Sequence, residues 1–323
     1  MTRSLALASV MALAASVAFA QTPPGPPGPP KTTAAVLTTR PGHELNVSVQ
    51  HYNYEEPDDV DISIHGPKFG GEYTGTLALS RRRHWFAQFN VRGTGAIARY
   101  DGWCRPWQIT PSSTSANGYR LTLGTRSPCS ETGDPDWYVD GRALLGKDVV
   151  GRAWAISPFI GVGARHLSNG VTGNFNYRTQ EYLYVPLGAT VRTTAVAGHA
   201  LEITMEYDYL LRGWNTTRNS LLGGGTVPAT ATTPAFAIGD FTDLSFKQRN
   251  GSALRASASF QLSRSWSMGP YYVRWRVADS PVSTGSVAYT VNAITVRQTL
   301  GYYEPHNFTN EFGVKIGLRL GRR

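Results

Sequence analysis

The sequence has 323 residues, of which 41% are hydrophobic and only 16% charged, and it contains 16 Tyr, 12 Phe, 8 Trp and 34 Gly. This aromatic, glycine-rich composition is typical of β structure and excludes a disordered chain. The net charge of +9 does not indicate nucleic-acid binding, because the Arg residues are spread along the predicted strands rather than gathered in one patch.

The chain begins with a segment that has the parts of a secretory signal peptide. A short apolar core follows Arg3, and the small-residue site AFA precedes Gln21. The core is shorter than the ~20 residues of a spanning helix, which argues against the alternative of a retained membrane anchor. We expect residues 1–20 to be the signal peptide of a protein exported by a Gram-negative bacterium. The Pro-rich residues 21–43 are predicted to form an extended, disordered periplasmic leader.

From about residue 44 onward, apolar and polar residues alternate over runs of about ten residues. In EYLYVPLGATVR, for example, Leu183 and Leu187 share one face while Tyr184 and Arg192 share the other. Alternation at period two predicts strands that have two different surroundings. About ten such runs occur, at residues 45–54, 72–79, 85–92, 136–143, 159–165, 181–192, 199–210, 254–262, 271–277 and 311–320.

The links between these runs alternate in length. SRRRH, LGKDVVGR, TTAVAGHA and LSRSW are short, whereas the links at 54–66, 101–134, 166–180, 212–250 and 278–307 are long. Short periplasmic turns and long extracellular loops are typical of outer-membrane barrels. Residues 44–323 are therefore predicted to form an all-β transmembrane antiparallel barrel of about 10 strands, with 8 or 12 as alternatives. A soluble β-sandwich is the competing fold.

In such a barrel the apolar face of each strand contacts lipid and the polar face lines the lumen. Nearly balanced charges would then face each other across the lumen and pair, because a buried unpaired charge is costly. A narrow, charge-filled lumen suggests a structural or surface-interaction role, and a small pore with a slight preference for anions is the alternative. The predicted lumen network contains Arg92, Asp136, Asp140, Arg142, Arg165, Arg192, Glu202, Glu206, Asp208, Arg255, Arg274, Arg276, Lys315 and Arg319, together with Glu72 and Glu311.

The long link at 101–134 contains the two Cys residues of the chain. In an exported protein Cys104 and Cys129 are expected to form one disulfide. Trp103 and Trp107 flank the first Cys in YDGWCRPWQ, and they could bind a surface ligand or pack a loop over the barrel mouth. The expected partners are outer-membrane lipid and lipopolysaccharide. The sequence contains no motif for a metal or a cofactor, and none is expected.

The strand number, the long outer loops and the pair Asp134 and Asp136 in GDPDW resemble the omptins, which are ten-stranded outer-membrane proteases. Omptins use one Asp pair and one Asp-His pair at the extracellular rim. Asp58, Asp59 and Asp61 in PDDVD form a second acidic cluster. The link after the seventh run, LLRGWNTTRNS, contains no Asp-x-His, so a base for water activation is missing and proteolysis is not expected.

The segment ARHLSNG resembles the His-x-Ser-Asn motif of the lipid A 3-O-deacylases, small outer-membrane barrels. The resemblance implies that Ser168 attacks an acyl ester while His166 takes its proton, and Glu181 on the next run could orient the His. By alternation His166 and Ser168 fall on the lipid-facing side at the outer rim. The chain is thus predicted either to carry a rim hydrolase of this kind or to have a His and a polar loop entry there without catalytic role.

Overall fold

The computed structural model describes residues 37–57, 62–169, 178–195, 199–221 and 224–320. The predicted signal peptide, 1–20, and residues 21–36 of the predicted leader lie outside the described residues. Within the described ranges, no helix is long and apolar enough to cross a membrane.

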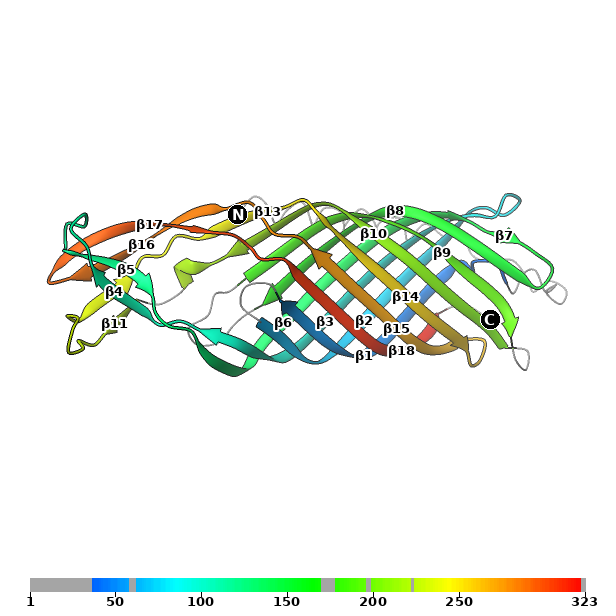
Figure 1. The fold of residues 1–323 in the computed structure, drawn as a ribbon. Coiled ribbons are helices and arrows are strands. Elements are labelled where there is room, and N and C mark those ends of the chain that lie inside the picture. The colour runs from blue at the N-terminus through cyan, green and yellow to red at the C-terminus, as the bar shows by residue number, and fades with distance from the viewer. Residues whose placement is uncertain (1–36, 58–61, 170–177, 196–198, 222–223, 321–323) are drawn as a thin grey trace.

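Ten antiparallel strands form a closed barrel (Figure 1), which confirms the predicted fold class. The ring closes where β1 pairs with β18, and the pairing of His43 with Leu320 puts the first and last strand ends at the same end of the barrel. In ring order the strands are β1 (Gly42–Glu56), β2 (Ile62–Ser80), β3 (Trp85–Cys104), β6 (Ser127–Lys147), β8 (Trp154–Asn169), β9 (Arg178–Ala195), β10 (His199–Thr217), β14 (Gly251–Gln261), β15 (Trp266–Val277) and β18 (Asn307–Leu320).

The alternation of the sequence separates lumen from lipid. In β1, Leu45, Val47 and Val49 are exposed on the outer wall, whereas Asn46 and Gln50 are buried inside. In a barrel that lies in a bilayer, apolar side chains face outward and polar side chains face inward, whereas a soluble sandwich has the opposite arrangement. The apolar outer wall continues around the ring with Phe69, Ile160, Val162, Leu183, Leu187, Ile203, Met205, Leu254, Phe260, Phe312, Val314 and Ile316.

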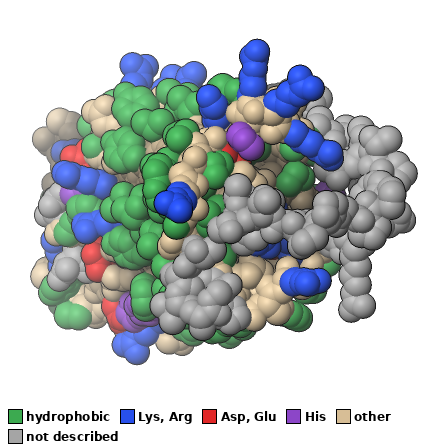
Figure 2. Space-filling model, turned by 90° about the vertical axis from the view of Figure 1, so that its right-hand side faces the viewer, with side chains coloured by type: hydrophobic (Ala, Val, Ile, Leu, Met, Phe, Trp, Pro, Cys, Tyr) green, Lys and Arg blue, Asp and Glu red, His purple; other side chains and the backbone are tan. Residues whose placement is uncertain are grey.

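Short, basic turns occupy one end of the barrel. Arg81, Arg82 and Arg83 form the exposed turn between β2 and β3, and β7 (Val149–Val150) precedes the turn into β8. Trp85 and Trp154 begin the strands that leave these turns. Seen from this end, hydrophobic side chains cover the flank and Lys and Arg side chains project at the rim (Figure 2). An aromatic and basic belt of this kind marks a membrane interface.

The long links at the other end fold into an extension (Figure 1). They contain β4 (Trp107–Pro111), β5 (Tyr119–Leu123), the 3-10 helix η1 (Asn219–Leu221), β11 (Gly225–Val227), β12 (Phe236–Gly239), β13 (Leu244–Gln248), β16 (Ser283–Val291) and β17 (Ile294–Tyr302). β4 and β5 pair with each other, β11, β12, β16 and β17 form a four-stranded sheet, and β13 extends the pairing of β10. The sequence analysis predicted loops here. Five of these seven strands have three to five residues, too few to show a clear alternation, and β16 and β17, with nine residues each, were missed.

The extension has a hydrophobic core of its own. Ile109 and Leu121 from the β4–β5 ribbon pack with Phe236, Val287 and Tyr289 from the four-stranded sheet. Three of the long links, at 101–134, 212–250 and 278–307, bury apolar side chains against one another and so hold one another in place.

Candidate functional site

The lumen is filled by side chains at mid-height. Arg255 on β14 donates to Asp140 on β6 (Nη2 to Oδ2, 2.6 Å) and to Asp208 on β10 (Nε to Oδ2, 2.6 Å). Arg142 on β6 donates to Glu206 on β10 across the barrel, with Nη1 2.5 Å from Oε1. β10 and β14 are neighbours in the ring, but β6 pairs with neither of them, so the Arg255–Asp140 and Arg142–Glu206 contacts reach across the lumen.

A second cluster lies closer to the extracellular end. Glu311 on β18 accepts hydrogen bonds from Arg92 (Nη2 to Oε2, 3.1 Å) and from the Tyr138 hydroxyl (2.6 Å), and Arg165 Nη2 lies 3.5 Å from its other oxygen. Arg165 and Glu311 are 2% and 1% exposed. Two buried guanidinium groups therefore share one buried carboxylate, and Tyr138 places its ring 4.3 Å from the Arg165 guanidinium.

The sequence analysis missed Lys68, the most deeply buried cation of the lumen. Its ammonium group pairs with Asp136 and lies 3.3 Å from the centre of the Tyr52 ring, and Asn169 donates to the same Asp. The segment HGPKFGG around this Lys contains three Gly and one Pro, so no clear alternation marked it as a strand. In the structure β2 pairs with β1 over this whole stretch, so the strand is visible only in the assembled sheet.

An aromatic cluster completes the filling of the lumen; together with the two charged clusters and Lys68 we call it the plug. Its strand, β15, also shows that two residues were wrongly predicted to line the lumen. Trp275 on β15 faces inward and packs against Tyr182 and Tyr184 with ring centres 5.2 Å apart in both pairs. Arg274 and Arg276, predicted to line the lumen, instead lie exposed on the outer wall, where each guanidinium faces the Phe308 ring. Alternation separates two faces but does not say which one is outside, and in β15 the apolar face fills the lumen.

The other predicted lumen residues all belong to the inward-facing rows of their strands. Those in the plug are Arg92, Asp136, Asp140, Arg142, Arg165, Glu206, Asp208 and Arg255, and those nearer the turn end are Arg192, Glu202, Lys315 and Arg319.

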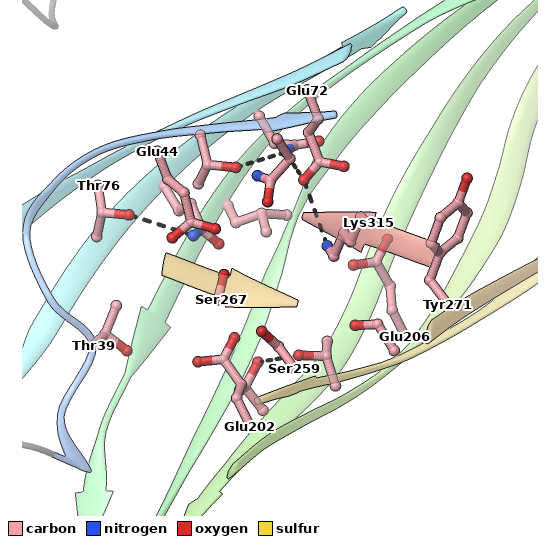
Figure 3. A pocket seen from close by; sticks show the side chains of 18 of the residues that line it. Thr39, Glu44, Glu72, Thr76, Glu202, Glu206, Ser259, Ser267, Tyr271 and Lys315 are labelled. Carbon is pink, nitrogen blue, oxygen red and sulfur yellow. Dashed lines mark hydrogen bonds and ion pairs between the residues drawn. The ribbon is translucent and has the colours of Figure 1, made fainter. Parts of the chain in front are cut away.

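Below the plug, toward the end with the short turns, lies a cavity of about 200 Å³ (Figure 3). Its wall is polar: Lys315 Nζ lies 3.8 Å from Glu72, and Arg192 donates to Glu202 over 2.6 Å. Thr39 closes part of its rim, since its N–H and its hydroxyl both donate to Asp148. The last residues of the predicted leader, 37–41, thus reach into the periplasmic mouth of the barrel, and the first strand begins at Gly42.

His166 and Ser168 of the His-x-Ser-Asn motif lie at the outer edge of the lipid-facing wall, whereas Asn169 faces the lumen and donates to Asp136. His166 on β8 pairs in register with Glu181 on β9, with Nδ1 3.5 Å from Oε1, and it packs on Trp137 at a ring distance of 5.3 Å. Ser168 lies on the same side two residues further and is 0% exposed. The structure therefore brings the His and the Glu together and places the Ser beside them, under cover.

The residues that resemble the omptin site do not form a comparable centre. Asp134 and Asp136 are both buried and inward-facing on β6, and Asp136 is engaged by Lys68. At the outer end of β10 the inward positions are Asn215 and Thr217, so no imidazole stands there. Asp58, Asp59 and Asp61 lie outside the described residues. Among the residues that the structure describes, no group of three or more His, Cys, Asp and Glu side chains could hold a metal ion.

The Cys pair and its aromatic neighbours belong to the extension. Cys104 at the end of β3 forms a disulfide with Cys129 on β6, as predicted. Trp107 packs on the core of the extension and lies 6.0 Å from the Phe241 ring, while Trp103 is partly exposed. These contacts of Trp107 fit the second of the two roles considered for this segment, which is to pack the loop in place.

A cluster at the barrel mouth, which we call the mouth clamp, joins the extension to the barrel. It consists of Glu304, in the link between β17 and β18, with Glu56, Arg178 and Tyr54. Arg178 Nη1 lies 2.6 Å from Glu56 and 3.3 Å from Glu304, and the Tyr54 hydroxyl donates to Glu56 over 2.8 Å. The pKa of Glu304 is raised to about 7, because burial and the nearby Glu56 carboxylate together outweigh the opposing effect of Arg178.

The sequence matches no family model and no curated protein. The fold is similar to three solved structures at low identity. The outer membrane protease OmpT of Escherichia coli is 8% identical with a TM-score of 0.49, over 90% of this chain and all of that one. The translocator domain of the autotransporter NalP of Neisseria meningitidis is 10% identical with a TM-score of 0.34, over 98% of each chain. A mutant of the monoaromatic hydrocarbon channel TodX is 9% identical with a TM-score of 0.34, over 87% of this chain and 91% of that one.

Proposed function

We propose that the protein is an integral outer-membrane barrel with a closed lumen, whose extracellular extension carries an interaction at the cell surface. The main support for the closed lumen is the plug of buried side chains inside the barrel. Lys68, Arg165 and Trp275 are at most 2% exposed although they lie inside the barrel. A ten-stranded barrel has an interior that side chains can fill, whereas the ~16-strand porins leave a channel.

The extension supports the interaction part of the proposal. Links that only connect strands need no core, yet here three long links bury apolar residues against one another and a disulfide staples one of them. An ordered surface on a rigid scaffold is what recognition requires, because little freedom is lost on binding.

Planar-bilayer recording tests the closed lumen. The folded, heat-modifiable protein is expected to give no conductance steps. A variant in which the aromatic plug is cut back, Trp275→Ala with Tyr184→Ala, is the positive control for the recording. Regular steps from the unmodified protein, with a preference for anions, would support the small pore and contradict the closed lumen.

The outer wall supports lipopolysaccharide as the lipid partner. Arg212, Arg274 and Arg276 are exposed above the apolar band, and none of the ion pairs found among the described residues involves them. Their guanidinium groups instead lie over the Trp214 and Phe308 rings. Cations at the height of the outer-leaflet headgroups attract lipid phosphates, and Arg can bind a phosphate through two donors.

Co-purification measures this lipid contact. Changing Arg212, Arg274 and Arg276 to Gln should lower the lipopolysaccharide retained by the detergent-purified barrel several-fold. The matched control changes Arg81, Arg82 and Arg83, which lie at the periplasmic turn, and should leave the retained amount unchanged. Equal losses in both variants would mean that net charge alone holds the lipid.

A second candidate is hydrolysis of an acyl ester of lipid A at the rim, favoured by the His166–Glu181 contact. A carboxylate that holds one imidazole nitrogen leaves the other to accept a proton from a nucleophile such as Ser168. The Ser is covered, so substrate binding would have to uncover it. Mass spectrometry of lipid A from expressing cells should show loss of an acyl chain that disappears in Ser168→Ala. Unchanged lipid A in cells with abundant folded protein would contradict this candidate.

A further inference from the structure

The free edge of β17 is the feature of the extension that is suited to bind another chain. In the four-stranded sheet the order is β11, β12, β16, β17, so β17 has a strand partner on one side only. The opposite edge strand, β11, has three residues, whereas β17 has nine. Proteins usually blunt exposed edges with short strands, Pro, bulges or inward charges. β17 has nine residues with no Pro and no bulge, and Arg297 is its one charged side chain.

The register shows which main-chain groups face the open side. A two-residue turn closes the β16–β17 hairpin, so Ile294 donates to Val291, and every second residue after it also bonds to β16. Ser286 supports this phase, because its N–H and C=O are both bonded to Thr242, on the side away from β17. The outward N–H and C=O groups of β17 therefore belong to Thr295, Arg297, Thr299 and Gly301, all of which are exposed.

The side chains beside this edge indicate the chemistry of a partner. Val296 and Leu300 pack on the core of the extension but stay half-buried. Between them, Gln298 accepts a hydrogen bond from the Leu121 N–H of β5 (3.0 Å) and donates to its carbonyl (2.9 Å). On the other face Arg297 is the one charged side chain of the strand; its Nη1 lies 3.0 Å from the Ser286 hydroxyl and its Nη2 lies 3.9 Å from Asp240, in an exposed ion pair that a carboxylate of a partner could replace. An added strand would cover apolar surface on one face and meet a cation on the other.

We propose that the β17 edge binds an extended segment of a partner protein, which adds a fifth strand to the sheet. The segment has apolar residues at every second position, to cover Val296 and Leu300, and a carboxylate opposite Arg297. Main-chain hydrogen bonds to the four outward residues supply affinity, and the alternate side chains supply selectivity. This inference rests on the proposed surface-interaction function and names where the partner binds.

The experiment uses the full protein in detergent micelles and a probe that already fits β17 from its other side. The probe is the peptide STGSVAYTV, which copies Ser283–Val291, and a second peptide, STGSVEYTV, carries Glu at the position that faces Arg297 in the native pair. Hydrogen exchange is followed at the amides of Thr295, Arg297, Thr299 and Gly301. We expect both peptides to slow exchange there at least 10-fold, and the Glu peptide to bind about two- to five-fold more tightly.

Two variants at one residue make the result specific. Thr299→Pro removes an N–H that β16 does not use, so it should abolish the peptide effect while the amides of Val296 and Gln298 stay protected by the hairpin. Thr299→Val keeps the N–H and should bind like the unmodified protein.

Three outcomes would overturn the proposal. They are unchanged exchange of the edge amides at millimolar peptide, equal binding by Thr299→Pro, and protection that rises with protein concentration without any peptide, which would identify a second copy as the occupant. Conductance of the same sample separates the two proposals. A conducting barrel with a protected edge contradicts only the closed lumen, and a silent barrel with an unprotected edge contradicts only the edge site.

Discussion

Ala293 has a backbone conformation that suits Gly better than Ala. It and Asn292 form the two-residue turn between β16 and β17, and both have positive φ angles, 65° and 51°. Turns of this type favour Asn followed by Gly, because a Cβ atom is strained there. Ala293→Gly should stabilise the hairpin by about 0.5–1 kcal/mol, measured as slower hydrogen exchange of the Val296 and Gln298 amides.

The control for this change is a Gly placed where the backbone is extended. Thr295→Gly lies two residues away in β17 and should weaken the hairpin, since Gly lacks strand-forming preference and loses the contact between the Thr295 and Thr290 hydroxyls. Equal effects of the two Gly substitutions would show that the turn is not strained at Ala293.

Substitutions at Glu311, on the inner side of the barrel wall, and at Arg274, on the outer side, are expected to differ in their effect on stability. Glu311→Gln keeps the shape of the side chain but leaves Arg92 and Arg165 buried without their shared carboxylate. We expect a loss of about 3–5 kcal/mol in the free energy of unfolding in detergent. Arg274→Gln removes an exposed charge on the outer wall and should change it by less than about 0.5 kcal/mol. A large loss of stability in Arg274→Gln would contradict the placement of this side chain on the outer wall.

At the scale of elements, the sequence predicts the barrel strands well because each long strand has two unlike surroundings. Each of the ten alternating runs corresponds to one barrel strand. The pairing of β1 with β18, which includes His43 and Leu320, puts both strand ends at the same end of the barrel, as expected for an even number of strands. The orientation of β15 could not be read in the same way. Its apolar row packs on Tyr182 and Tyr184 from β9, a strand far away in sequence, so only the assembled ring shows that this row faces inward.

Other features escaped sequence analysis for related reasons. Lys68 was missed because its Gly and Pro neighbours give no alternation, although its partner Asp136 was predicted to face the lumen. The strands of the extension are mostly three to five residues long, and their order depends on contacts between separate links. Period-two patterns need longer runs, and contacts between links leave no local pattern in the sequence.

The β3–β6 hairpin continues beyond the barrel, and the disulfide crosses it there. Cys104 and Cys129 enclose the β4–β5 ribbon in a loop with a sequence separation of 25. Closing a loop of this length stabilises by about 3.5 kcal/mol in the chain-entropy model. Replacing both Cys residues by Ser should speed proteolysis between them in intact cells, while the heat-modifiable shift of the barrel stays unchanged. Loss of that shift would mean that the barrel itself depends on the disulfide.

At the scale of the whole molecule, the plug and the extension are linked through the mouth clamp. Arg178 begins β9, Glu56 ends β1, and Glu304 belongs to the link that leads from the extension back into the barrel. The same link is fixed to the end of β15, because the Glu304 N–H donates to the Ser280 hydroxyl and the Ser280 N–H donates to the Glu304 carbonyl. Two carboxylates that share one guanidinium group therefore fix this link of the extension to the barrel mouth.

This dependence makes the attachment of the extension sensitive to pH. The pKa of Glu304 is about 7 in the clamp, against 4.5 for an ordinary Glu, so between these values the docked link holds a proton that a released link has lost. Docking is then favoured at low pH, and the advantage is lost as the pH rises from about 4.5 through 7. Between pH 5 and 8 the fraction of released link should rise on the order of 10- to 100-fold.

Glu304→Gln isolates this effect, because the amide resembles the protonated acid and does not titrate. Limited proteolysis of the 278–306 region is measured for both proteins at each pH, and the ratio of the two rates removes the pH dependence of the protease. We expect the ratio of unmodified protein to Glu304→Gln to be near one at pH 5 and to rise toward pH 8. A constant ratio would mean that Glu304 does not change its protonation state across this range, and this link of the extension would then keep its position on the barrel at every pH tested.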